Sequence, residues 1–184
     1  MAQTILGISG SLRKGSNSTA ILKSLAARDW NGSRIAIHDL IDIPLYNGDL
    51  DTDDKPAAVD ALKDAITAAD ALLIVSPEFN YGTPGVLKNA LDWASRPAYQ
   101  SPLKGKPVLI ITSSPGAMGG VRAQEQLRKT LFGTLSVLVP FPEIAIASVG
   151  AKLTDGVLSD EATLQLATRG VQALLDWPKG KPAE

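Results

Sequence analysis

Short apolar runs alternate along the whole chain with segments in which apolar residues recur every three or four positions. Uninterrupted apolar runs are typical of strands buried on both faces, and the longer spacing is typical of amphipathic helices. The predicted strands are Thr4–Ser9, Arg34–His38, Ala71–Val75, Val108–Thr112 and Leu135–Val139. The predicted helices have their apolar positions within 21–26, 59–69, 86–94, 127–131 and 164–174.

Five strands separated by helical crossovers predict an α/β fold with helices on both faces of a parallel sheet. For a chain of this length, we expect a flavodoxin-like three-layer sandwich with strand order 2-1-3-4-5. A (β/α)8 barrel would need more residues and eight such units. Ligands of open α/β sheets bind beyond the carboxyl ends of the strands, at the switch point between strands 1 and 3. The informative loops are therefore those after Ser9, Ser76 and Thr112.

Composition narrows the function classes. The 184 residues suit one domain, 1–184, and a hydrophobic fraction of 45% is enough for a core. A net charge of −1 favours neither a nucleic-acid partner nor a membrane surface, and the absence of cysteine excludes disulfides and thiol chemistry. No apolar run approaches the ~18 residues of a membrane span, and the first residues already resemble a strand. We therefore expect a cytoplasmic protein without nucleic-acid or membrane partners.

The loop after the first strand has the features of an anion site. Residues 10–19 lead into a helix whose first backbone N–H groups attract phosphate. A Walker A loop is excluded because Ser16 replaces its lysine, and the glycine spacing excludes a dinucleotide fingerprint, which makes Asp39 a turn residue. A simple helix cap on a flexible turn is the alternative. The candidate phosphate ligands are Ser11, Arg13, Ser16, Asn17, Ser18 and Thr19.

The loops after the third and fourth strands suit a flat ring. Phe79, Asn80 and Tyr81 offer planar contact and amide hydrogen bonds in a loop stiffened by Pro77 and Pro84. The alternative is a hairpin-like cap whose aromatic residues belong to the core. The segment 113–120 has three glycines, which allow close approach of the backbone to a ligand. Because all three loops lie at neighbouring strand ends, a phosphate at one and a ring at the others predict noncovalent FMN.

Two segments also carry a family resemblance. Residues 10–16 (GSLRKGS) and 77–93 (PEFNYGTPGVLKNALDW) resemble the NADPH-dependent FMN reductase family, particularly its bacterial quinone/chromate reductase branch. The similarity extends from Ile5 to about Leu175. It implies a flavodoxin-like fold and a homodimer or homotetramer with FMN near the subunit interface. It also implies phosphate ligands and ring-lining residues at Ser11, Arg13, Ser16, Pro77, Glu78, Phe79, Asn80, Tyr81, Ser113 and Gly116.

This chain departs from the family pattern at two positions. The family often has tyrosine where Phe79 stands, so a phenolic hydrogen bond is lost. It also tends to have asparagine at the position of Ser18, whereas the asparagine here is Asn17. The phosphate contacts expected of Asn17, Ser18 and Thr19 depend on this exchange.

The resemblance predicts an oxidoreductase in which NADPH or NADH passes hydride to FMN. Electrons would then go to quinones, chromate-type oxyanions, azo compounds or free flavin. No acid or base residue is assigned, since His38 is expected to be structural. Lys14, Arg96 and Arg122 are each able to meet the 2′-phosphate of NADPH. The alternatives are an electron carrier or redox sensor without its own turnover, and a scaffold binding another phosphorylated ligand.

The helix from Pro84 to Arg96 carries an oligomerisation hypothesis. Trp93 projects away from the apolar stripe of this helix, and Arg96 and Tyr99 follow it. Aromatic residues and arginine are enriched at interface centres, so we expect an exposed Trp93 in a subunit contact. The alternative is that Trp93 folds back onto a loop of its own chain.

Overall fold

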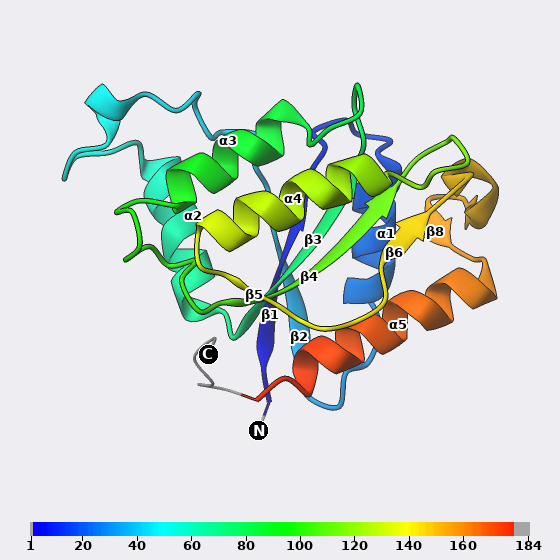
Figure 1. The fold of residues 1–184 in the computed structure, drawn as a ribbon. Coiled ribbons are helices and arrows are strands. Elements are labelled where there is room, and N and C mark those ends of the chain that lie inside the picture. Colours follow the sequence, from blue (N-terminus) through cyan, green and yellow to red (C-terminus); the bar gives the residue numbers. More distant parts are fainter. Residues whose placement is uncertain (1, 179–184) are drawn as a thin grey trace.

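A parallel sheet forms the middle layer of the protein (Figure 1). The computed structural model describes residues 2–178, so the ends of the predicted domain, residue 1 and residues 179–184, lie outside the described residues. The strands run in the order β2-β1-β3-β4-β5, with β6 also paired to β4, which confirms the predicted order. They are β1 Thr4–Ser9, β2 Arg34–His38, β3 Ala71–Pro77, β4 Pro107–Ser113, β5 Val137–Leu138 and β6 Ile144–Ile146.

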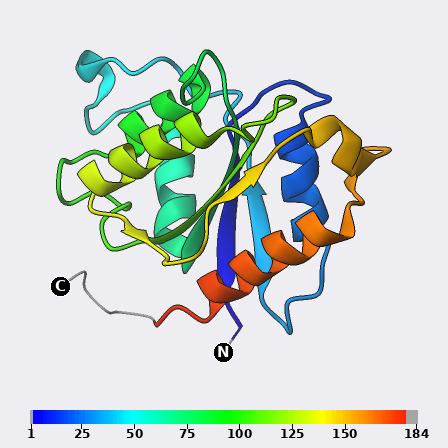
Figure 2. The ribbon, with the colours of Figure 1, turned by 45° about the vertical axis from the view of Figure 1, so that its right-hand side comes forward.

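Helices cover both faces of this sheet. Figures 1 and 2 show α1 and α5 on one side and α2, α3 and α4 on the other. Each group packs on its own apolar cluster, and the side chains of β1 and β3 alternate between the two clusters. The helices are α1 Asn17–Ala26, α2 Ala57–Ala68, α3 Gly85–Ala94, α4 Val121–Gly133 and α5 Glu161–Leu175. The 3-10 turns are η1 Gly48–Leu50 and η2 Val149–Lys152.

The fifth strand differs from the prediction. Instead of one strand over 135–139, the edge of the sheet holds two short strands, β5 and β6, which pair with opposite ends of β4. Leu135 lies outside β5 and has a φ of 61° in the turn that ends α4. Pro140 and Pro142 separate β5 from β6. Because proline has no N–H to donate to a ladder, the chain leaves the sheet after Leu138 and returns at Ile144.

A small hairpin follows β6 and was not predicted. Its strands are β7 Leu153–Thr154 and β8 Val157–Leu158, joined by a two-residue turn. Asp155 and Gly156 have φ values of 51° and 75°, as a type I′ turn requires. The N–H of Leu158 donates to Ser24 Oγ at 2.9 Å, which fixes the hairpin against α1.

Trp93 is buried, so the expectation of an exposed interface tryptophan is wrong. Its side chain is 0% exposed, and its Nε1–H donates to the carbonyl of Pro44 at 2.8 Å. Tyr46 packs edge-on against its ring at 4.8 Å between centroids. The helical wheel correctly turns Trp93 away from the sheet, but the loop before η1 crosses that face of α3 and covers it. The alternative that Trp93 folds back onto its own chain is confirmed.

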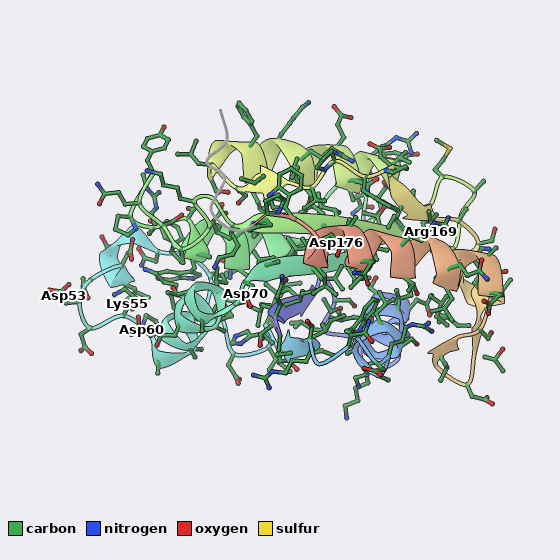
Figure 3. All side chains as sticks on the ribbon, turned by 90° about the horizontal axis from the view of Figure 1, so that it is seen from below. Asp53, Lys55, Asp60, Asp70, Arg169 and Asp176 are labelled. Carbon is green, nitrogen blue, oxygen red and sulfur yellow. The ribbon has the colours of Figure 1, made fainter. Side chains whose placement is uncertain are left out.

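The rest of this loop is acidic and lies at the periphery. Figure 3 shows Asp53 projecting outward, with Lys55 and Asp60 behind it. Lys55 Nζ and Asp60 Oδ1 are 3.8 Å apart. Within the described residues, no cluster of histidine or acidic side chains could hold a metal ion, and no helix has the length and apolar character that a membrane span demands.

Candidate functional site

The phosphate-binding candidate is the loop between β1 and α1. Gly10 N–H donates to the carbonyl of Val75, which places the start of the loop beside the end of β3. Ser16 N–H donates to the carbonyl of Arg13, and Ser16 Oγ accepts from Thr19 N–H at 3.2 Å as the N-cap of α1. The first-turn N–H groups of Asn17 and Ser18 have no acceptor within the helix. The cap therefore leaves these two N–H groups available to an anion.

Two pairs of hydroxyl groups tie the start of α1 to the sheet. Ser18 Oγ and Ser113 Oγ are 3.1 Å apart and both side chains are buried. Ser9 Oγ and Thr19 Oγ1 are 2.7 Å apart. The first pair joins the start of α1, just after the loop that follows β1, to the end of β4, where the third loop starts. The hydroxyl of Thr19 is engaged toward β1.

The loop after β3 contains a tight turn. Phe79 and Gly82 exchange backbone hydrogen bonds of 3.1 and 2.9 Å, and Asn80 and Tyr81 between them have φ values of 48° and 64°. These are the angles of a type I′ turn. Phe79 is 56% exposed and Tyr81 is 70% exposed. The hairpin-like cap is thus confirmed, but its aromatic residues are on the surface and not in the core.

The carboxylate of Glu78 serves helix α4. Its Oε2 accepts from the backbone N–H groups of Arg122 and Ala123 at 2.9 and 3.1 Å, and its side chain is 11% exposed. Helix α4 has no capping side chain of its own because Gly120 occupies its N-cap position. The negative charge also lies at the positive end of the helix dipole. Glu78 therefore holds the second loop against the third.

Replacing Glu78 with glutamine should lower the free energy of unfolding by about 1 kcal/mol, because the amide oxygen still accepts the two hydrogen bonds but the negative charge at the positive end of the helix dipole is lost. Urea unfolding followed by circular dichroism measures this loss. Glu143→Gln is the matched control, because Glu143 is 54% exposed and its Oε1 lies 3.3 Å from Arg128 Nε. A Glu78→Gln variant as stable as the Glu143→Gln variant would contradict the capping role.

The loop after β4 is anchored on its outer side. Ser114 N–H donates to the carbonyl of Ile146, and Val149 N–H donates to that of Ser114. Ser148 N–H donates to the carbonyl of Gly116 at 3.1 Å. The loop is therefore held by β6 and η2, the two elements that follow the split in the fifth strand.

One pocket gathers residues from all three loops. The predicted site residues that line it are Ser11, Arg13, Ser16, Asn17, Ser18, Pro77, Phe79 and Ser113. Pro115 and Val149 also line it, and of these two only Val149 was not predicted. Pro115 lay within the third candidate loop, whereas nothing in the sequence pointed to Val149, which arrives through η2.

Five predicted residues lie outside the lining of this pocket. Thr19 and Glu78 are engaged as described above, and Asn80 and Tyr81 occupy the tip of the turn. Gly116 is exposed, and its N–H donates to Ser114 Oγ at 3.2 Å.

His38 and Asp39 have structural roles in the fold. His38 lies at the end of β2 and does not line the pocket; its burial lowers the pKa, against the opposing charge of Asp39. Asp39 Oδ1 accepts from Ile41 N–H at 3.0 Å in a local turn. Both observations agree with the structural roles predicted for these residues.

Comparison with known proteins adds a family and several relatives. Residues 3–151 match the model of the family described as NADPH-dependent FMN reductase. An NAD(P)H-dependent FMN reductase of Pseudomonas aeruginosa is 44% identical over 174 residues, covering 94% of each chain. A quinone reductase of Escherichia coli is 40% identical over 172 residues, covering 89% of each.

The solved structures show the same similarity. FerB, a flavoenzyme NAD(P)H:(acceptor) oxidoreductase from Paracoccus denitrificans, superposes with a TM-score of 0.83 at 38% identity. The match covers 96% of the present chain and 97% of FerB. An azoreductase from Bacillus anthracis, at 15% identity and a TM-score of 0.63, shares the fold.

Proposed function

The chain belongs to the NADPH-dependent FMN reductase family, and we propose that it is an oxidoreductase that holds FMN noncovalently and moves electrons from NADPH or NADH to small acceptors. The observation that carries this proposal is the single pocket that the three loops after β1, β3 and β4 line together. Bound FMN would supply the redox chemistry by accepting a hydride and releasing electrons to the acceptor.

The residues of the pocket fit the two ends of FMN. The hydroxyls of Ser11 and Ser16, the guanidinium of Arg13 and the first N–H groups of α1 together suit a phosphate dianion. Phe79, in the loop after β3, offers an exposed aromatic face for the ring. The pocket has a volume of about 100 Å³, and its rim at Phe79 and Pro115 is exposed. An open rim suits a cofactor that must meet a donor and an acceptor in turn.

Quinones are the favoured acceptors, because relatives named quinone reductase and 2-hydroxy-1,4-benzoquinone reductase are 40% and 44% identical to this chain. Chromate-type oxyanions and azo compounds remain further candidates for an open site. We also propose a homodimer or homotetramer in a cytoplasmic setting. Leu45 is 84% exposed and Phe132 is 79% exposed in the single chain, and a subunit contact would be able to cover such side chains. Light scattering at micromolar concentration tests the subunit number.

The proposed function is tested on purified protein in two steps. Denaturation should release FMN, identified by chromatography; FAD or no flavin would overturn the proposal. Anaerobic mixing with NADPH or NADH should then bleach the flavin absorbance, and a quinone should restore it. If neither donor bleaches the bound flavin, the electron carrier or redox sensor is the better description.

Replacing Arg13 with alanine should weaken FMN binding by ~1.5–3 kcal/mol, because a charge-assisted hydrogen bond to the phosphate is lost. The quenching of flavin fluorescence during titration of the apoprotein gives the dissociation constant. Arg28→Ala serves as the control, since Arg28 is exposed beyond the other end of α1. Equal affinities of the two variants would place the phosphate away from Arg13.

A further inference from the structure

Of the three cations that the sequence offers for the 2′-phosphate of NADPH, two are engaged elsewhere. The guanidinium of Arg96 lies over the ring of Tyr46 at 5.5 Å. That of Arg122 lies over the ring of Tyr81 at 4.4 Å, and its Nη1 is 3.7 Å from Glu78 Oε1. Lys14 is exposed, and among the described residues its ammonium group has no hydrogen-bond or ion-pair partner. Lys14 is therefore the cation available for a new ligand.

Lys14 lines a groove between α1 and the β7–β8 hairpin, the α1 groove. Its volume is about 510 Å³. One wall is a single face of α1, with Thr19 and Lys23 four residues apart. The other wall is formed by Gly150, Leu153 and Gly156, so that mostly backbone faces the space. A volume of this size is in the range of small-molecule sites.

Both walls of the α1 groove are held in place. The hairpin is tied to α1 by the hydrogen bond from Leu158 to Ser24. At its base, Lys152 Nζ donates to Asp160 Oδ2 at 3.0 Å. Hydrogen bonds from Thr163 and Lys152 lower the pKa of Asp160 to about 2, so this carboxylate stays ionised and keeps its partners at neutral pH. The hairpin wall of the groove is thus held to α1 and to the start of α5.

The charge of the α1 groove is positive, and the groove adjoins the FMN pocket. Lys23, like Lys14, has no ion-pair partner among the described residues, and no acidic side chain lines the groove. Ser16 and Asn17 line both the groove and the pocket. A ligand held in the groove would therefore lie beside the FMN phosphate, with these two residues between them.

We propose that the α1 groove binds the 2′-phosphorylated adenosine end of NADPH, with Lys14 and Lys23 on the phosphate. The inference rests on the proposed function, because it requires a nicotinamide donor at the flavin. NADPH and NADH differ only in the 2′-phosphate, and two unpaired ammonium groups distinguish a dianion from a hydroxyl. The two lysines therefore set a preference for NADPH.

The test compares Lys23→Gln with Lys104→Gln, which removes the same charge at the opposite end of the sheet, just before β4. Calorimetric titration of the FMN-loaded protein with 2′,5′-ADP should show binding that Lys23→Gln weakens roughly tenfold, the effect of one lost charged contact. In steady-state assays, Lys23→Gln should lower the NADPH-to-NADH ratio of kcat/KM by a similar factor. Lys14→Gln should act in the same direction, and Lys104→Gln should leave both readouts unchanged.

Two results would overturn this inference. One is equal binding of 2′,5′-ADP by the Lys23→Gln and Lys104→Gln variants. The other is release of FMN from Lys23→Gln, which would assign the groove to the flavin itself. Failure of the proposed function is distinguishable, because the bound flavin would then be reduced by neither donor while the calorimetric titration would still report on the groove.

Discussion

Replacing Gly119 with alanine is expected to lower the free energy of unfolding by about 3–5 kcal/mol. Two effects add, because the new side chain would be held in a left-handed backbone conformation and would overpack against its neighbours. Gly119 has a φ of 62°, and a Cβ there would lie 2.6 Å from the carbonyl carbon of Ala145 and 2.9 Å from the nitrogen of Ile146. Both contacts are with the backbone of β6, which cannot rotate away. Urea unfolding measures the loss, and flavin titration should show weaker FMN binding because the third loop moves.

Gly133→Ala is the matched control for Gly119→Ala. Gly133 ends α4, and a Cβ there would meet no atom within 4 Å. The same added methyl group should leave stability unchanged or raise it by about 0.4–1 kcal/mol through the unfolded state. If Gly119→Ala were as stable as Gly133→Ala, the close approach between the third loop and β6 would be wrong.

Replacing Trp93 with alanine should cost about 3–5 kcal/mol of unfolding free energy, as expected for a fully buried tryptophan. The change also removes the hydrogen bond to Pro44 and the ring contact with Tyr46. Asn89 would still hold the loop before η1, because its side chain donates a hydrogen bond to the carbonyl of Pro44 and accepts one from Tyr46 N–H. Thermal unfolding measures the loss, and faster proteolysis within the loop before η1 should accompany it.

Tyr99→Ala provides the comparison for Trp93→Ala, since Tyr99 follows the same helix but is 67% exposed. A surface substitution of this kind should change stability by less than about 0.5 kcal/mol. A Trp93→Ala variant that matched Tyr99→Ala in stability would return Trp93 to the surface and revive its role in a subunit contact.

Much of the site was predictable because its signals are local. The end of β1, the glycines and hydroxyls of residues 10–19, and Ser16 as N-cap all lie within one short segment. The same holds for Phe79 and its turn, whose residues are neighbours in the chain. Once alternation fixes the strand order, the ends of β1, β3 and β4 must lie side by side. The convergence of the three loops follows from that order.

Contacts between distant segments were not predictable in this way. Glu78 is expected from the family resemblance to line the flavin ring. In the structure its carboxylate instead caps a helix that begins more than forty residues later. Val149 lines the pocket from η2, which follows β6 at the edge of the sheet. Nothing in the local pattern of Trp93 shows that the segment around Pro44 covers it.

The sequence by itself therefore determined the layers, the strand order, the edge of the sheet at which the candidate site lies and the residue types in the loop after β1. These depend on hydrophobic period and on loop chemistry, which act over a few residues. The tertiary structure alone decided which charged and aromatic groups remain available. Arg96, Arg122, Glu78 and Trp93 are engaged by partners distant in sequence, while Lys14 and Lys23 are left facing a groove. Packing between distant segments determines these partners, and the local periodicity of hydrophobic residues contains no information about such packing.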